Sequence, residues 1–213
     1  MKKIILLLIL IVLISIPLNC ESSLITSNSY LATLFYNQYK EYHQNYFSGN
    51  DINRLVSKIF RPKVLNFYCK ITEANGQIVN NIINYALKYD LPLHLTFALA
   101  YKESGFNPNA TNYNTGGSKD RGLFQLNNIY FKFNNERDVY NIEINTMHGL
   151  RYLRFCYEVA NYNSAIAVLS YNMGSSNALR CNGVIPNFRK DYVNSILSYE
   201  KYLDRRFNEY GWK

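Results

Sequence analysis

The clearest hydrophobic pattern in the chain lies between Thr72 and Tyr89. Its apolar residues are spaced three or four positions apart, which places them on one face of a helix, because each turn contains 3.6 residues. The helix is expected to end at the turn sequence of residues 90–92, because the residue before a proline disfavours the helical conformation. The apolar side chains recur every three or four residues, at Ile78, Ile82, Tyr85, Ala86 and Tyr89.

The following segment, from Leu91 to about Ser104, is apolar on nearly all sides. A helix of this kind is expected to be buried in the core. Asp90 is its expected N-cap, and Pro92 suits its first turn. Gly105 can end the helix in a left-handed conformation. The helix therefore places the carboxylate of Glu103, in its last turn, where the core meets a polar loop.

Weaker patterns complete a mostly helical α+β domain. Residues 105–121 are polar and rich in Asn, Gly, Thr and Ser, which is typical of turns or a short hairpin. Further helices are expected at about 145–159, 163–171 and 188–207. We predict one domain over 72–213, with a small hairpin element and a groove between its lobes, since 213 residues are too few for two full-sized domains.

Residues 21–71 precede this domain and are predicted to form a helical arm. Apolar and aromatic groups occur at roughly helical spacing over 29–47. The polar residues 48–51 break the pattern and can cap a second short helix that runs through Phe60. We interpret the arm as a packing layer or spacer rather than a separate binding module.

Residues 1–20 have the order of an export signal. Lys2 and Lys3 precede an apolar run over residues 4–16, which the sequence PLNC follows. The run is shorter than the roughly 20 residues of a membrane-spanning helix. Cys20 stands where a lipoprotein signal places its lipidated cysteine, although the flanking residues match that motif loosely. A periplasmic lipoprotein, a soluble secreted protein and an uncleaved anchor are the three alternatives, and we expect the lipoprotein.

The formal charge of the chain is +8. Without Lys2 and Lys3 it has 21 basic and 15 acidic residues, a net charge of +6. A basic exported protein is attracted to the anionic wall and to lipid headgroups rather than to nucleic acid. The chain is expected to act there as a monomer.

Three further cysteines, Cys69, Cys156 and Cys181, would meet an oxidising compartment. Cys156 with Cys181 is the preferred disulfide pair, because both lie in one helical region. The alternative is that all three are small buried side chains without a bond.

Glu103 is the strongest candidate for chemistry. Burial at the end of an apolar helix disfavours the charged form of a carboxyl group and so raises its pKa. A protonated carboxyl near neutral pH is what cleavage of a glycosidic bond requires of a general acid. A glutamate taken alone is more often a surface residue, so its neighbours decide between the two interpretations.

Those neighbours resemble the signature blocks of the soluble lytic transglycosylase family. Residues 103–110 read ESGFNPNA, residues 122–127 read GLFQLN and residues 170–174 read SYNMG, in the family's order. The similarity covers about residues 72–200. It implies a lysozyme-like fold of the goose-type class and cleavage of the bond between MurNAc and GlcNAc in peptidoglycan, with 1,6-anhydro ends as product.

The resemblance also implies roles for individual residues. Glu103 would be the general acid and then the base. Tyr192 would donate a hydrogen bond near it, and Gly122 would allow close backbone approach. The segment before Tyr192 departs from the family, because Phe188-Arg189-Lys190 replaces a Glu-Thr-Arg. The remaining expected substrate-binding residues are Ser104, Gln125, Tyr171 and Asn172.

Asp120 opens an alternative. The stretch 103–127 also resembles the hen-type lysozymes, in which Asp120 matches the nucleophilic aspartate of a retaining hydrolase. The competing interpretation is a loop aspartate that holds a turn. A third hypothesis is a catalytically silent wall-binding lipoprotein that keeps the groove as a glycan clamp.

Other kinds of site are not indicated. The histidines, His43, His94 and His148, are scattered, with no Cys or carboxylate at ligand spacing, so we predict no metal site. No Gly-rich phosphate loop follows a strand. We therefore expect no cofactor.

Overall fold

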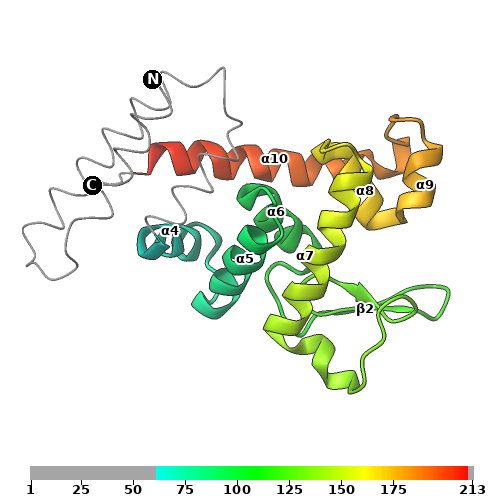
Figure 1. The fold of residues 1–213 in the computed structure, drawn as a ribbon, viewed down its shortest axis with the longest axis horizontal. Coiled ribbons are helices and arrows are strands. Elements are labelled where there is room, and N and C mark those ends of the chain that lie inside the picture. Colours follow the sequence, from blue (N-terminus) through cyan, green and yellow to red (C-terminus); the bar gives the residue numbers. More distant parts are fainter. Residues whose placement is uncertain (1–60, 211–213) are drawn as a thin grey trace, which may run out of the picture. The chain divides into compact units, whose positions relative to one another are not determined.

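The structure is a computed structural model that describes residues 61–210. The expected export signal, Cys20 and the helices expected over 29–47 and through Phe60 lie outside these residues. The described part consists of eight helices and three short strands (Figure 1). In chain order these are α4 (Arg61–Thr72), α5 (Gly76–Lys88), α6 (Leu93–Ser104), β1 (Thr111–Tyr113), β2 (Lys119–Arg121), β3 (Leu126–Asn127), η1 (Glu136–Tyr140), α7 (Ile142–Val159), α8 (Ser164–Met173), α9 (Ser175–Arg180) and α10 (Asn187–Glu209).

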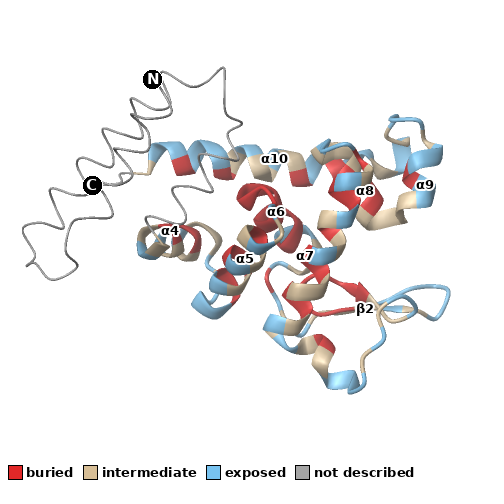
Figure 2. Ribbon diagram, viewed as in Figure 1, coloured by how far each residue is buried: buried red, intermediate tan, exposed pale blue. Residues whose placement is uncertain are grey.

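Helix α6 forms the centre of the core, as its apolar sequence predicts. Every residue from Leu93 to Ala100 is buried, and α10 packs along the helix (Figure 2). Gly105 ends α6 in the left-handed conformation, at φ 60°. The carboxylate of Glu103 is thereby placed in the last turn of a helix whose first eight residues are buried in the core.

The start of α6 differs from the expectation. Pro92, not Asp90, occupies the N-cap position, and it makes no side-chain cap. Asp90 has φ 54°, and its carboxylate lies 3.7 Å from Nη1 of Arg154 in α7. The aspartate therefore serves the turn between α5 and α6 and an ion pair rather than a helix cap.

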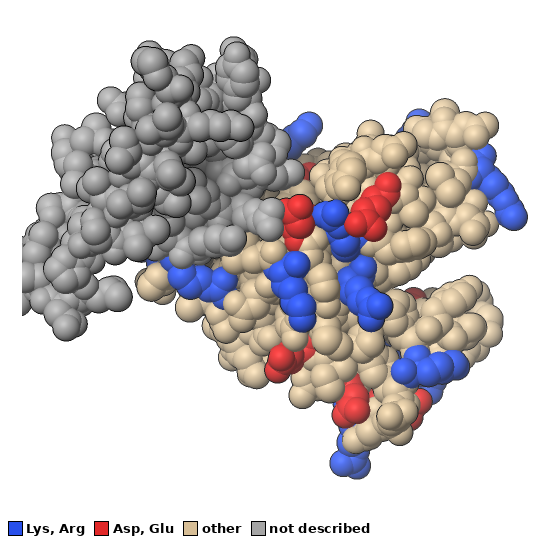
Figure 3. Space-filling view, in the orientation of Figure 1, with Lys and Arg blue, Asp and Glu red and all other residues tan. Residues whose placement is uncertain are grey.

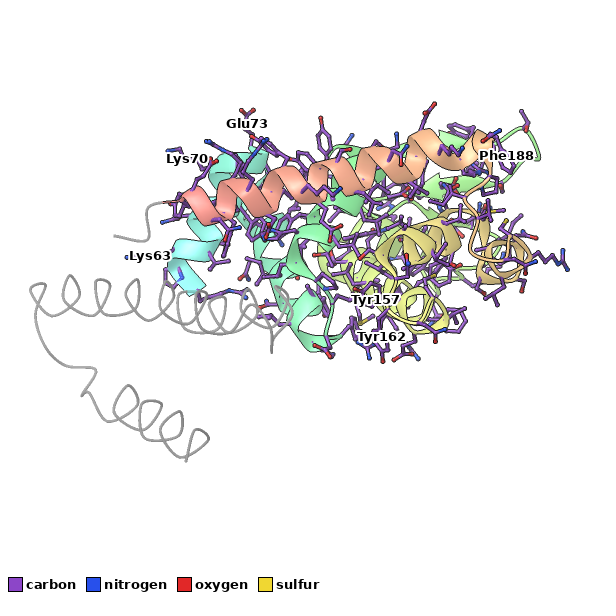
Figure 4. The ribbon with its side chains drawn as sticks, turned by 90° about the horizontal axis from the view of Figure 1, so that it is seen from above. Lys63, Lys70, Glu73, Tyr157, Tyr162 and Phe188 are labelled. Carbon is purple, nitrogen blue, oxygen red and sulfur yellow. The ribbon has the colours of Figure 1, made fainter. Side chains whose placement is uncertain are left out.

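Helix α4 packs into the core, although its sequence was assigned to the arm. The ring of Tyr68 stacks on that of Phe97 in α6, with 3.8 Å between the ring centroids. Phe67 meets Phe207 of α10 edge to face, with 5.1 Å between the ring centroids. Figure 4 shows α4, with Lys63 and Lys70, beside one end of α10. Residues 61–72 therefore belong to the folded domain.

The three strands form a small antiparallel sheet in the order β1-β2-β3. Thr111 pairs with Arg121 across β1 and β2, and Asp120 pairs with Asn127 across β2 and β3. The polar stretch that predicted turns or a hairpin is thus a hairpin with a third strand added. In Figure 1 this sheet lies on the side of α7 away from α10.

The remaining helices close the domain around α7 and α8. Asn141 caps α7 by accepting hydrogen bonds from the backbone N–H groups of Glu143 and Ile144, so α7 begins three residues before the expected start. The short helix α9 was not expected from the sequence. Among residues 61–210, no helix is long and apolar enough to cross a membrane.

The disulfide between Cys156 and Cys181 was a wrong expectation. Both thiols are free, as is that of Cys69. Cys156 is buried within α7, whereas Cys181 ends α9 and its thiol donates to the carbonyl of Asn177 at 3.4 Å. The alternative, small buried cysteines without a bond, holds for Cys156, whereas Cys69 and Cys181 are only partly buried.

Candidate active site

Glu103 lies in the last turn of α6, where α10 crosses it. Its side chain is partly buried, and the hydroxyl of Tyr192 from α10 donates a hydrogen bond to Oε1. The sequence assigned both residues to the site, and the structure brings them together. The unusual segment before Tyr192 therefore does not displace this tyrosine.

Burial raises the pKa of Glu103 to about 7, and the nearby charge of Asp120 acts in the same direction. The hydrogen bond from Tyr192 and the charge of Lys102 lower the pKa. Burial dominates, so a substantial fraction of the carboxyl groups is protonated at neutral pH. This carboxyl can donate a proton and take one back in the same pH range.

Ser104 connects the catalytic helix to the second sequence block. Its hydroxyl donates to the carbonyl of Leu123 at 2.8 Å. The end of α6 and the loop at 122–125 are therefore held at a fixed separation. In this structure the Ser104 hydroxyl bonds to another part of the protein, so its contacts indicate a positioning role.

Gly122 allows a close approach to its backbone, and the atoms that approach it belong to the protein itself. A Cβ atom at this position would lie 2.2 Å from Nδ2 of Asn145 and 2.5 Å from the carbonyl oxygen of Val139. Gly122 also has φ 77°, a conformation that favours glycine. The glycine thus lets the start of α7 reach the loop beside Glu103.

Asn145 is a structural residue of the site that sequence reasoning missed. Its amide accepts a hydrogen bond from the backbone N–H of Phe124 at 2.7 Å, and donates to the carbonyls of Arg121 and Val139. It is almost fully buried. A polar residue at a buried position of a predicted helix was the available signal, because such groups require partners.

Gln125 has a similar internal role. Its side-chain N–H groups donate to the carbonyls of Gly122 and Ala110, at 2.8 and 3.3 Å, and its Oε1 accepts from Asn112 of β1 at 2.8 Å. Gln125 therefore joins the loop at 122–125 to the sheet. Any contact with a glycan would use its remaining acceptor capacity.

Tyr171 and Asn172, at the end of α8, bring the third sequence block to the site. The hydroxyl of Tyr171 donates to the carbonyl of Phe124 at 2.9 Å. Burial raises the pKa of Tyr171, and the charge of Glu103 adds to this effect, so the two groups lie near each other. Oδ1 of Asn172 is buried and has no hydrogen-bond partner among the described residues, which leaves an acceptor for a ligand.

Asp120 faces the same region from β2. Oδ1 accepts from Nδ2 of Asn127 at 2.6 Å, and Oδ2 accepts from Nδ2 of Asn114 at 3.0 Å. These bonds hold the hairpin turn together, as the turn interpretation expected. Asp120 also contributes to the raised pKa of Glu103, so a second carboxylate lies within electrostatic reach of the first.

The surface around these elements is hollowed. Figure 3 shows a recess between the part of the domain with α8 and α9 and the part with the sheet. Basic and acidic side chains are mixed on the face shown there. Within the described part of the chain, no three His, Cys, Asp or Glu side chains gather as metal ligands would.

Comparison with known families identifies the domain. A model of the Transglycosylase SLT domain matches residues 80–211. The chain belongs to this family. The SLT domain thus extends from within α5 to α10 and covers every candidate site residue, and it confirms the family expected from the three sequence blocks.

Individual proteins share parts of this SLT domain. Protein IpgF of Shigella flexneri and that of Shigella sonnei are each 49% identical to the chain over 45 residues. This stretch is 21% of the chain and 30% of each relative's length. An X-ray structure of an inactive mutant of lytic transglycosylase Slt from Pseudomonas aeruginosa superimposes with a TM-score of 0.51 at 18% identity. The likeness covers 61% of this chain and 24% of Slt, and it confirms the lysozyme-like fold.

Proposed function

We propose that this chain is a peptidoglycan lytic transglycosylase that cleaves the bond between MurNAc and GlcNAc, with Glu103 as general acid and then base. The proposal depends on one observation, the carboxyl of Glu103. It has a pKa of about 7, lies within the SLT domain and accepts a hydrogen bond from the hydroxyl of Tyr192. The protein would meet its substrate after export, anchored as a lipoprotein through Cys20.

The proposed reaction returns Glu103 to its starting state. Glu103 donates its proton to the glycosidic oxygen while the bond from that oxygen to the anomeric carbon of MurNAc breaks. The C6 hydroxyl of the same MurNAc then attacks the anomeric carbon and gives its proton to the Glu103 carboxylate. The products are a strand with a new GlcNAc hydroxyl and a 1,6-anhydroMurNAc end, and no water is consumed.

The surroundings of Glu103 suit both halves of this cycle. Burial favours the protonated form that starts the reaction, whereas the Tyr192 hydroxyl stabilises the carboxylate that forms when the proton leaves. The unpartnered acceptor of Asn172 is suited to a donor on the sugar, such as the N–H of an N-acetyl group or a hydroxyl.

A second candidate function is a muramidase that uses Asp120. Burial raises the pKa of Glu103, and Asp120 is held by hydrogen bonds from two amides, so the site contains two carboxyl groups in unlike environments. In this mechanism Asp120 would attack the anomeric carbon and water would complete the hydrolysis. The SLT membership favours the lyase, and the position of Asp120 favours the hydrolase.

The products distinguish the two functions. Digestion of purified sacculi is expected to release muropeptides with 1,6-anhydroMurNAc ends, measured by mass spectrometry. Asp120→Asn should lower the rate without changing the kind of product. Reducing MurNAc ends from the unchanged protein would show the hydrolase instead.

The raised pKa of Glu103 predicts the pH dependence of the reaction. Because the protonated acid starts the reaction, kcat/KM is expected to fall as the pH rises through about 7. Tyr192→Phe removes the hydrogen bond that lowers this pKa, so the fall should move to higher pH and the maximal rate should decrease. A pH profile of both proteins on the same soluble glycan measures the shift, and an unchanged midpoint in Tyr192→Phe would contradict it.

A further inference from the structure

We propose that an aromatic strip formed by Tyr130, Phe131, Tyr152 and Phe155 binds the glycan strand beyond the bond that is cleaved. The inference rests on the proposed function and extends it, because it names the part of the substrate that the strip would contact. The strip begins next to Tyr171, a site residue, and lies on α7 and the loop after β3.

Ring contacts connect the strip to the site. The ring of Tyr152 lies 5.1 Å from that of Tyr171, which lines the site. Tyr152 in turn stacks on Phe155 at 6.2 Å and meets Phe131 edge to face at 5.7 Å. Tyr130 directly precedes Phe131 in the loop after β3, and its side chain is exposed.

The loop of the strip is also tied to Asp120. Asn127, at the end of β3, donates to Oδ1 of Asp120 and accepts a hydrogen bond from the backbone N–H of Ile129 at 2.9 Å. The backbone N–H groups of Tyr130 and Phe131 both bond to the Asn127 carbonyl. One residue therefore positions the second carboxylate and the start of the strip.

The outer members of the strip are exposed rather than packed in the core. Tyr130 is 82% exposed and Phe155 is 48% exposed, whereas Tyr152 and Phe131 are partly buried. Neighbouring Ile129 is 55% exposed. Phe155 contacts the ring of Tyr152, and residues 129 and 130 precede Phe131, whose ring also contacts Tyr152. Exposed apolar side chains gathered in this way indicate a binding surface rather than scattered exposure.

A sugar strand fits this surface better than a charged partner does. One face of a pyranose ring presents C–H groups, which pack on an aromatic face, while its hydroxyls keep their contact with water. The four strip residues have no formal charge, so the rings themselves would bind through such apolar contacts. A strand that enters the site beside Tyr171 continues outward, and the strip lies next to that residue.

The test compares long and short substrates with the full chain. Tyr130→Ala/Phe155→Ala removes the two exposed rings and leaves Tyr152 and Tyr171 in place. For long glycan strands, KM is expected to rise about 10-fold with kcat little changed, because contacts far from the reacting bond add binding and not chemistry. For a short oligosaccharide of two disaccharide repeats, both constants should stay within about twofold of the unchanged protein.

Tyr162→Ala is the matched control. Tyr162 is 60% exposed, and its ring contacts Tyr157 rather than any strip residue. Figure 4 shows Tyr157 and Tyr162 near each other, away from α10. This variant should bind and cleave long strands as the unchanged protein does, so loss in the control would indicate a general effect of removing surface rings and would overturn the proposal.

Two other results would also overturn it. An unchanged KM for long strands would mean that the strip serves another partner, and an equal loss on the short substrate would place its rings inside the cleavage groove. Failure of the proposed function is separable from these results. Sedimentation of a Glu103→Gln protein with insoluble sacculi, with and without the two strip substitutions, measures strand binding even where no cleavage occurs.

Discussion

Glu103→Gln is expected to lower the rate of glycan cleavage by about 1,000-fold or more, because glutamine has no proton to donate to the glycosidic oxygen. The substitution changes one atom of the carboxyl group and keeps its size. The amide oxygen can still accept the hydrogen bond from Tyr192. Release of soluble muropeptides from purified sacculi measures the loss, which should appear in kcat.

Glu200→Gln is a suitable control, since it makes the same chemical change at a second glutamate with a similar pKa. Burial raises the pKa of Glu200 to about 7, with Asp204 as the next cause. Glu200 lies on α10 two helical turns beyond Tyr192, about 12 Å along the axis. We expect this variant to keep its activity. Equal losses at Glu103 and Glu200, or none at Glu103, would contradict the assignment of the acid.

The same Glu103→Gln substitution should stabilise the fold at high pH. The pKa is about 7 in the folded protein against 4.5 for an unperturbed glutamate, so the folded state binds more protons between these values. The free energy of unfolding of the unchanged protein therefore falls as the pH rises from about 4.5 to 7, by up to about 3 kcal/mol. Glutamine does not titrate, so the variant should match the unchanged protein at pH 4 and exceed it above pH 7 in urea unfolding.

The position of Glu103 could be predicted from the sequence because two independent features agree on it. The apolar residues of α6 require burial on all sides, and Gly105 ends the helix two residues after Glu103. The local pattern therefore predicts both that the helix is buried in the core and at which residue it ends. The chemistry of a buried carboxyl at that point follows from its environment.

The partners of the other block residues could not be predicted in this way. Ser104, Gly122 and Gln125 each match the family's blocks, but their observed contacts are with the protein. A motif shows which residues recur around a site, and it does not separate those that contact a ligand from those that hold the loop. Only the three-dimensional arrangement shows that Asn145 is the common partner of this loop.

Two further differences have long-range causes. Helix α4 belongs to the core because Phe67 and Tyr68 meet α10 and α6, and a local pattern does not reveal partners so far along the chain. The pairing of Cys156 with Cys181 rested on closeness in sequence, whereas a disulfide depends on the geometry of two side chains. Contacts between distant segments are the part of a fold that periodicity leaves open.

Gly122→Ala is expected to destabilise the domain by several kcal/mol and to lower activity with it. The added Cβ would lie 2.2 Å from Nδ2 of Asn145 and 2.5 Å from the Val139 carbonyl oxygen, and neither contact can be kept. Overpacking of this kind costs about 1–3 kcal/mol, and the left-handed backbone adds about 1 kcal/mol for a residue with a side chain. Moving Asn145 would also break its hydrogen bonds to the loop beside Glu103.

Gly117→Ala separates the two contributions. Gly117 has φ 80°, close to the 77° of Gly122, but no atom lies within 4 Å of a Cβ built there. This variant should lose only the backbone contribution of about 1 kcal/mol and retain its activity. Thermal and urea unfolding of the two variants give the difference, which measures how strongly the contact between Gly122 and Asn145 fixes the site. Equal stabilities would mean that α7 shifts to admit the methyl group, and the loop at 122–125 would then depend on Ser104 and Gln125 for its position.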